Sequence, residues 1–183
     1  MPEINLTPQL EERVAARFPE APLVSLHSEL SEAARAQHWR AAFEGAARIV
    51  LGTRLAIFTP LPDLGLIIVD EEHDASFKQQ EGMRYSARDV AVFRARARDI
   101  PIVLGSATPS LESWANATDP RTRARYRLLT LKARAIGGAR LPAVRRIDTR
   151  QEKLQDGCCD ALLAAINMRL ARGEQSLVFL NRR

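Results

Sequence analysis

Leu64–Asp74 reads LGLIIVDEEHD, and this stretch decides how the rest of the chain is interpreted. Five of its first six residues are apolar. A continuous apolar run of this length predicts a strand buried on both faces, as in a parallel sheet covered by helices. The run then ends in a charged cluster: Asp70, Glu71, Glu72, His73 and Asp74. The carboxyl ends of strands are where open α/β sheets hold ligands, so the stretch predicts a Mg²⁺-nucleotide site.

The composition suits a globular chain that binds a polyanion. The chain has 183 residues, of which 46% are hydrophobic, and a formal net charge of +5 with a pI of about 9.9. This length and composition allow a sizeable core and predict one domain with part of another. The excess of Arg and Lys favours a polyanionic partner such as nucleic acid.

The sequence predicts neither a membrane segment nor secretion. No apolar run approaches the roughly twenty residues that a transmembrane helix needs. The N-terminal sequence, MPEINLTPQLEER, is too polar and acidic for a signal peptide. Cys158 and Cys159 are adjacent, which suits neither a spaced zinc pair nor a disulfide framework. We therefore expect a cytoplasmic protein without a membrane partner, and no zinc site in this chain.

Helices and strands are expected to alternate through the first two-thirds of the chain. Thr7 followed by Pro8 makes a good helix start, and Ser31, Ser86 and Ser110 can each begin a further helix. Apolar runs predict the intervening strands at residues 23–26, 48–51, 64–69 and 100–104. This alternation predicts an α/β fold with a parallel sheet that helices cover on both faces.

The helix expected at residues 86–99 divides into two faces. Ala87, Ala91 and Ala95 fall on one face, which we expect to be buried. Arg88 and Arg94 fall on the other face, which we expect to be exposed to solvent.

The character of the chain changes near Asp119. We expect residues 1–118 to form a first lobe, residues 119–158 a basic connection, and residues 159–183 the beginning of a second lobe. Weak strands are predicted at residues 127–131 and 143–147. A helix at 161–170 and a strand at 176–180 would open the second lobe.

The charged cluster is expected to carry the chemistry. Asp70 would hold Mg²⁺, Glu71 would orient or deprotonate a water for attack on a γ-phosphate, and His73 would sense the nucleotide. The alternative is a helix N-terminus whose carboxylates only favour the helix dipole.

A second motif lies in IPIVLGSATPS, residues 100–110. Ser106 and Thr108 follow a predicted strand and precede a predicted helix, so their hydroxyls could simply cap that helix. They come one strand-helix unit after D-E-E-H, however, and hydroxyls at a neighbouring strand end can hydrogen-bond the charged cluster and report the state of a phosphate.

The pairing of D-E-E-H with S-A-T resembles motifs II and III of superfamily 2 helicases. More narrowly, the chain resembles the replication-restart DNA helicases of that superfamily. The segments that carry this resemblance are PEINLTPQ (2–9), LGTR (51–54), FTPLPDLGLIIVDEEHDASFKQQEGMRYSARDVAVFRA (58–95), IPIVLGSATPSLES (100–113) and SLVFLNRR (176–183). The resemblance implies a RecA-like sheet in an incomplete first helicase lobe, followed by the start of a second RecA-like lobe.

The resemblance also implies roles for individual residues. Asp70 and Glu71 would be catalytic, with Asp70 holding Mg²⁺ through the nucleotide. The residues that would couple nucleotide to DNA are Glu72, His73, Gly105, Ser106 and Thr108. Those that would follow the DNA backbone are Thr7, Pro8, Gln9, Gly52, Thr53 and Arg54.

A loop after the charged cluster matches a family loop that links DNA contact to ATP turnover. Its residues are Phe77, Lys78, Gln79, Gln80, Arg84 and Tyr85. Aromatic rings can stack on bases, and cations can contact phosphates. The alternative is that one Phe and one Tyr only pin the loop to the core.

The sequence departs from the family pattern at one essential motif. No G-x-x-x-x-G-K-[ST] occurs in the 183 residues. In the family that phosphate-binding motif would precede Met1, and the zinc-binding cysteines and arginine finger would follow Arg183. We therefore expect an internal fragment that needs ATP and Mg²⁺ as cofactors in a longer protein and hydrolyses ATP poorly by itself. Zinc is expected only in that longer protein.

The function expected from the resemblance is part of an ATP-dependent 3′-to-5′ DNA helicase. Such an enzyme would remodel stalled replication forks and initiate primosome assembly, with forked and single-stranded DNA, single-stranded DNA-binding protein and primosome components as partners. A first alternative is an inactive DNA-binding or partner-binding module. A second alternative is another superfamily 2 translocase or an RNA helicase.

Overall fold

The computed structural model describes residues 8–122, 125–132, 143–151, 154–155 and 157–179. The chain divides into two compact units, with the boundary between Leu129 and Thr130.

The first unit alternates helices and short strands, as the sequence predicts. Its α-helices are α1 (Pro8–Arg17), α2 (Glu32–Phe43), α3 (Ala87–Ala97) and α4 (Leu111–Thr118). Its strands are β1 (Leu23–Leu26), β2 (Ile49–Gly52), β3 (Ile67–Val69), β4 (Lys78–Gln79), β5 (Tyr85–Ser86) and β6 (Ile102–Leu104). Short 3₁₀ turns occur at η2 (Arg54–Phe58), η3 (Ala75–Phe77) and η4 (Pro120–Thr122).

Three of the four expected helix starts are confirmed by capping hydrogen bonds. The hydroxyl groups of Ser31, Ser86 and Ser110 accept the backbone N–H three residues further on, which satisfies one of the donors that a helix start leaves unpaired. Thr7, the fourth expected start, lies outside the described residues.

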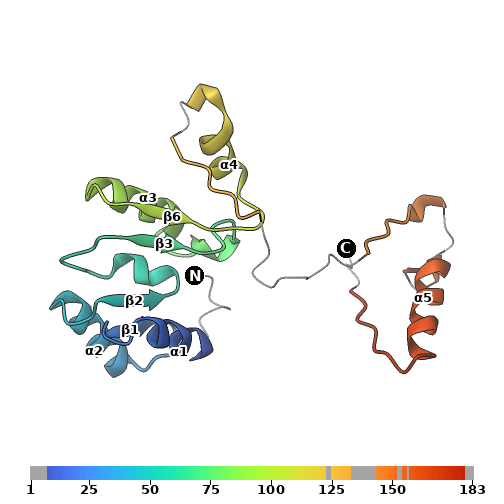
Figure 1. Ribbon diagram of the computed structural model, residues 1–183, viewed down its shortest axis with the longest axis horizontal. Coiled ribbons are helices and arrows are strands. Elements are labelled where there is room, and N and C mark those ends of the chain that lie inside the picture. Colours follow the sequence, from blue (N-terminus) through green and yellow to red (C-terminus); the bar gives the residue numbers. More distant parts are fainter. Residues whose placement is uncertain (1–7, 123–124, 133–142, 152–153, 156, 180–183) are drawn as a thin grey trace. The chain divides into compact units, whose positions relative to one another are not determined.

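The strands form small parallel sheets rather than one continuous sheet. β1 pairs with β2 and β3 pairs with β6, both in parallel. Figure 1 shows the four strands in the order β1, β2, β3, β6 within one layer, with α3 beside the β3–β6 pair. β4 and β5 form a separate antiparallel hairpin. The first unit is therefore mixed α/β with parallel strand pairs.

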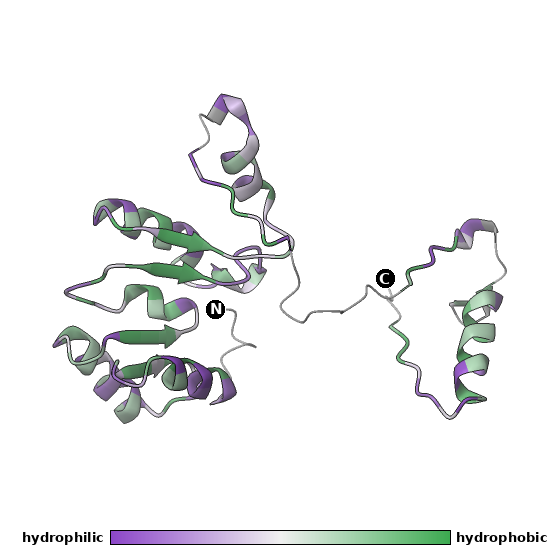
Figure 2. Cartoon of the chain, viewed as in Figure 1, coloured by the Kyte–Doolittle hydropathy of each residue, from purple (hydrophilic) through white to green (hydrophobic). Residues whose placement is uncertain are grey.

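The core that positions the acidic strand lies between β3, η3 and α3. Val69, Phe77, Ala87 and Ala91 are all buried and form one apolar cluster. The three buried alanines of α3 confirm the expected inner face. Figure 2 shows the same pattern, since β3 and β6 are coloured as hydrophobic while the helices beside them mix polar and apolar residues.

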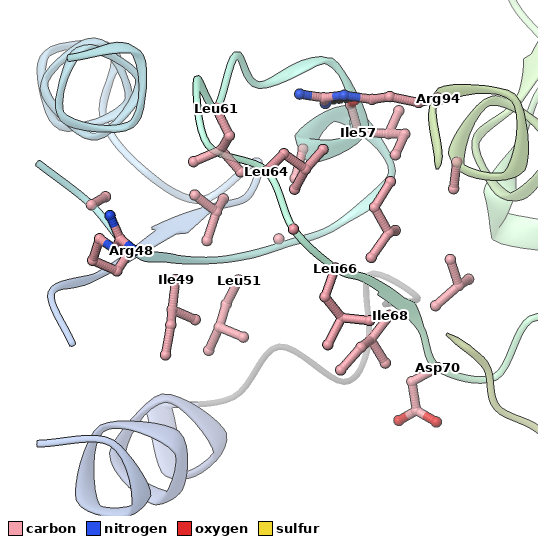
Figure 3. Close-up of a pocket in the computed structure, with 18 of the residues that line it drawn as sticks. Arg48, Ile49, Leu51, Ile57, Leu61, Leu64, Leu66, Ile68, Asp70 and Arg94 are labelled. Atoms are coloured by element: carbon pink, nitrogen blue, oxygen red, sulfur yellow. Dashed lines mark hydrogen bonds between the residues drawn. The ribbon is translucent and has the colours of Figure 1, made fainter. Parts of the chain in front are cut away.

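The expectation that β3 is buried on both faces is wrong. Val69 is buried, but the side chain of Ile68 is 63% exposed. β3 has a hydrogen-bonded neighbour on one edge only among the described strands. Beside it lies a hollow of about 690 Å³, which Ile49 and Leu51 of β2 line from the other side (Figure 3). A strand at the rim of a hollow cannot be covered on both faces.

The expectation that the arginines of α3 are solvated is also wrong for two of them. Arg94 donates hydrogen bonds to the backbone carbonyls of Ile57 and Thr59, which fixes η2 against α3. The side chain of Arg88 is only 11% exposed and makes an ion pair with Glu72. Periodicity places both residues on the polar face, but it cannot show that another segment packs over that face.

The second unit is small. It contains η5 (Thr149–Gln151), the hairpin strands β7 (Leu154–Gln155) and β8 (Cys158–Cys159), and α5 (Asp160–Leu170). Helix α5 confirms the helix expected at 161–170. Residues 127–131, 143–147 and 176–179 contain no strand, so those three expectations are wrong for the described residues. No helix in the described part of the chain has the length and hydrophobicity needed to span a membrane.

Candidate functional site

The charged cluster and the S-A-T turn lie at the same edge of the β3–β6 pair. The parallel register sets Val69 opposite Leu104, so Asp70 and Gly105 follow directly on neighbouring strands. Two backbone hydrogen bonds extend the pairing beyond the strands, from Gly105 N to Val69 O and from Glu72 N to Gly105 O. A Cβ atom at position 105 would lie 3.4 Å from Oδ1 of Asp70, so glycine keeps the space beside that carboxylate open.

His73 joins the two motifs through hydrogen bonds. Its Nδ1 lies 2.7 Å from Oγ of Ser106, and its Nε2 lies 3.4 Å from Oγ1 of Thr108. The hydroxyl of Ser106 also accepts the backbone N–H of Thr108, which shapes the turn. The structure therefore brings together three of the residues to which the sequence assigns a coupling role.

Glu71 has a backbone conformation that non-glycine residues rarely adopt. Its φ is 49°, in the left-handed region, and strain of this kind concentrates at functional sites. Its carboxylate is 39% exposed and lies 3.5 Å from Nδ1 of His73. Glu71 thus holds a partly solvated carboxylate beside the histidine.

Glu72 differs from its neighbours because it is only 3% exposed. Its carboxylate accepts hydrogen bonds from the N–H and the hydroxyl of Ser110, the hydroxyl of Ser113 and Nη1 of Arg88. Burial by itself would raise the pKa of Glu72, but these hydrogen bonds outweigh it and lower the pKa below the ordinary value of 4.5. Glu72 is therefore ionised, and its hydrogen bonds to Ser110 and Ser113 hold the start of α4 in place.

The expected DNA loop is a short hairpin held by the core. Phe77 is buried and Tyr85 is half-buried, with its ring 5.0 Å edge-to-face from that of Phe58. This arrangement matches the alternative in which the aromatic residues pin the loop. The exposed residues of the segment are Lys78, Gln80 and Arg84, while Gln79 is half-buried and donates to the carbonyl of Glu81.

The G-T-R segment lies beside the hairpin. A Cβ atom at Gly52 would lie 2.1 Å from Cβ of Ala56, so the end of β2 leaves no room for a side chain there. Thr53 is 8% exposed. Nη1 of Arg54 donates to the carbonyls of Ser76 and Lys78, at 3.0 and 3.4 Å. In this structure the segment therefore supports the hairpin.

The remaining expected DNA contacts lie at the start of the chain. Pro8 and Gln9 are the first two residues of α1, and both are exposed. Thr7 lies outside the described residues.

The donors at the strand ends fit a magnesium ion that is bound mainly through nucleotide and water. No group of three metal-binding side chains occurs among the described residues. Mg²⁺ commonly uses one or two carboxylates and completes its shell with water and phosphate oxygens. Asp70 is exposed, and its Oδ1 accepts the backbone N–H of Glu71. A single open carboxylate of this kind suits such an ion.

Sequence reasoning missed Arg88, Ser110 and Ser113 as partners of the site. Ser110 is identifiable only as a helix cap from sequence, and it does cap α4. That its backbone N–H also reaches Glu72 at 2.7 Å follows from how β3 and α4 pack.

A parallel strand pair that ends in an acidic cluster, bridged by histidine to a hydroxyl-bearing turn, is typical of a nucleotide-dependent motor lobe. The chain belongs to the DEAD/DEAH box helicase family, whose model matches residues 1–117. The family comprises ATP-dependent helicases, and this membership implies ATP and Mg²⁺ as cofactors.

The chain is also similar over its whole length to proteins named replication restart protein PriA. It is 42% identical to that protein from Bacillus subtilis over 187 aligned residues, 43% identical to that from Haemophilus influenzae, and 46% identical to that from Synechocystis. The alignments cover all of this chain but only 22%, 24% and 22% of the respective relatives. The chain therefore spans about a quarter of the length of these relatives.

Proposed function

We propose that this chain is part of an ATP-dependent 3′-to-5′ DNA helicase of replication restart. The complete protein would remodel stalled forks in the cytoplasm and initiate primosome assembly. Its partners would be forked and single-stranded DNA, single-stranded DNA-binding protein and primosome components. The proposal is supported by the similarity to relatives named for replication restart.

The observation that carries the proposal is the hydrogen-bonded bridge from His73 to Ser106 and Thr108. It joins the end of β3 to the turn after β6, so a displacement at one strand end moves the other. A motor needs such a connection, because turnover at the nucleotide must change how nucleic acid is held.

The residues at the strand ends would then have different roles in ATP turnover. Mg²⁺-ATP, when bound, supplies the phosphoryl chemistry that drives strand separation. Asp70 would hold the ion through its exposed carboxylate. Glu71 would orient the attacking water, and His73 would transmit the state of the phosphate to the S-A-T turn. Glu72 and Gly105 would support this by fixing the two strand ends to each other.

DNA would lie along the exposed, basic side of the hairpin. Lys78, Gln80 and Arg84 are exposed there and would contact phosphates. Phe77 and Tyr85 would hold the hairpin against the core. Two further segments would complete the path of the DNA backbone. These are Thr7, Pro8 and Gln9 at the start of the chain, and Gly52, Thr53 and Arg54 after β2.

We further propose that residues 1–118 form most of a first RecA-like lobe, residues 119–158 a basic connection and residues 159–183 the beginning of a second lobe. The hollow between β2 and β3 supports this assignment (Figure 3). Among the described strands β2 pairs with β1 and β3 pairs with β6, and apolar side chains line the space between β2 and β3. A further parallel strand from a longer protein would complete one continuous sheet.

The test is Asp70→Asn in the full-length natural protein. We expect ATP turnover to fall at least about a hundredfold, while affinity for forked DNA stays within about twofold, because the change removes a charge from the nucleotide side only. Asp63→Asn, at an exposed loop position, is the matched control and should leave both quantities unchanged. Turnover is measured by phosphate release and affinity by fluorescence anisotropy.

Other outcomes would point to the alternatives. Stimulation of the wild-type protein by double-stranded RNA in place of forked DNA would indicate an RNA helicase or another translocase. DNA binding without any ATP turnover in the full-length protein would indicate a binding module. Loss of DNA affinity in Asp70→Asn would remove Asp70 from the nucleotide site.

A further inference from the structure

A buried ion pair connects three elements of the first unit. Glu72 follows β3, Arg88 lies in the first turn of α3, and Ser110 caps α4. Nη1 of Arg88 lies 3.2 Å from Oε2 of Glu72 and 2.8 Å from Oγ of Ser110. The side chains of Arg88 and Glu72 are only 11% and 1% exposed, so the pair is shielded from solvent.

The guanidinium of Arg88 makes contacts that a single ammonium group could not reproduce. Its Nε donates to Oδ1 of Asp89 at 2.8 Å while Nη1 faces Glu72 and Ser110. A second carboxylate, that of Glu112 on α4, lies 3.9 Å from Nη1. Lysine offers one compact charge, whereas arginine presents donors in a rigid planar fork. The geometry therefore specifies arginine at position 88.

One side of this cluster connects to the hairpin. Tyr85 and Ser86 form β5, and α3 begins at Ala87, so Arg88 follows the hairpin after one intervening residue. The capping hydrogen bond from Asp89 N to Ser86 Oγ makes the end of the hairpin continuous with the first turn of α3. Arg88 therefore lies directly after the hairpin, in a turn that is hydrogen-bonded to the end of the hairpin.

The other side connects to the S-A-T turn. Ser110 is only two residues beyond Thr108, and its N–H donates to Oε1 of Glu72 at 2.7 Å. The hydroxyl of Ser113 donates to the other oxygen, at 2.9 Å. Arg88 and Glu72 together thus fix the point at which the turn enters α4.

We propose that Arg88 is the positioning residue that transmits movement of the hairpin at residues 78–86 to the S-A-T turn at residues 106–108. Arg88 would act without touching nucleotide or DNA, because its guanidinium contacts Asp89, Glu72 and Ser110. It acts through Glu72 and Ser110, which hold the turn that contacts His73. This role deepens the proposed function, on which it rests, because it assigns the link between DNA contact and ATP turnover to one buried ion pair.

The test compares Arg88→Met and Arg88→Lys with Arg96→Met in the full-length natural protein. Arg96 lies on the same helix and is exposed, so it is the matched control. The measured quantities are kcat and KM for ATP with saturating forked DNA, the DNA dissociation constant and the melting temperature. Arg88→Lys keeps a cation beside Glu72 and should preserve folding if Arg88→Met does not.

We expect both Arg88 variants to lower the DNA-stimulated kcat by about tenfold, within the usual range of coupling between sites. KM for ATP and the DNA dissociation constant should stay within about twofold in Arg88→Lys, because neither binding surface changes. Arg96→Met should behave as the wild type.

Three results would overturn the proposal. A normal DNA-stimulated kcat in both Arg88→Lys and Arg88→Met would show that the Arg88–Glu72 pair does not transmit movement of the hairpin to the S-A-T turn. A parallel loss of kcat, affinity and melting temperature in Arg88→Lys would show a purely structural role. Absence of DNA-stimulated turnover in the wild-type protein would overturn the proposed function itself, and this role with it.

Discussion

At the scale of single residues, the acidic cluster shows how similar side chains acquire different roles. Asp70 is exposed beside Gly105, whereas Glu72 is buried and receives four hydrogen bonds. Asp74 caps η3 by accepting the N–H of Ser76 at 2.7 Å. Composition alone gives these residues the same charge, and only their neighbours decide which carboxylate is open to a ligand.

The cap at Asp74 leads to a pH prediction. The N–H of Ser76 stabilises the charged carboxylate and lowers the pKa of Asp74 below its ordinary value of 3.8. A lowered pKa in the folded state means that the stabilisation is present above pH 3.8 and is lost as the pH falls through the folded value. We expect Asp74→Ala to lower the melting temperature at pH 7, by the equivalent of about 1 kcal/mol.

The difference in melting temperature between wild type and Asp74→Ala should shrink as the pH falls below 3.8 and through the lowered pKa of Asp74, because the wild-type carboxyl then loses its charge. Thermal unfolding followed by circular dichroism at several pH values measures this difference. Asp63→Ala, at an exposed loop position, is the control. A difference that grew as the pH fell below 3.8 would contradict the role of the charged cap.

At the scale of elements, packing changes what the motifs do. The sequence assigns G-T-R to the DNA backbone; in the structure Gly52 packs against Ala56 of η2, and Arg54 donates to the carbonyls of Ser76 and Lys78. Phe77, expected on a DNA-binding loop, lies in the core with Val69. Local patterns locate such residues correctly but do not tell which element will pack against them.

The close contact between Gly52 of β2 and Ala56 of η2 leads to a stability prediction. In Gly52→Ala the new Cβ would lie 2.1 Å from Cβ of Ala56 and 2.9 Å from the carbonyl oxygen of Leu26. Overpacking of this kind costs about 1–3 kcal/mol, so the melting temperature should fall. Gly65→Ala is the matched control, because nothing lies within 4 Å of a Cβ there. Equal melting temperatures for the two variants would contradict the packing at Gly52.

At the scale of the whole molecule, the basic charge is the property that bears on a partner. The net charge is +5, and Lys78 and Arg84 are exposed on the hairpin. Affinity for single-stranded nucleic acid depends on salt because each neutralised phosphate releases counterions. The slope of log K against log salt concentration therefore reports how many phosphates the chain contacts.

We expect the 183-residue chain to bind a thymidine oligonucleotide less tightly as salt rises. Replacing Lys78 and Arg84 by Ala should reduce the slope of log K against log salt concentration by about 1.4, which is the value for two contacts to a single strand. Replacing Arg35 and Arg40, two exposed arginines of α2, is the control. An unchanged slope in the hairpin variant would remove the hairpin from the DNA path.

The sequence by itself determined where the elements lie and which residues meet at the strand ends. Alternation of apolar runs with capped helices located β1, β3, β6 and three helix starts, because these signals are local in the chain. Two adjacent parallel strands bring their carboxyl ends together, so the meeting of His73 with Ser106 followed from order and direction.

The tertiary structure decided how exposed each residue is and which partner it has. Ile68 is exposed beside a hollow, although its apolar run predicts burial on both faces. The side chain of Arg88 is mostly shielded and pairs with Glu72, although its helical position predicts exposure. Burial depends on elements that are distant in the sequence, because a face is covered only when another segment packs on it. The periodicity of one helix or strand does not show which distant segment will pack on its faces.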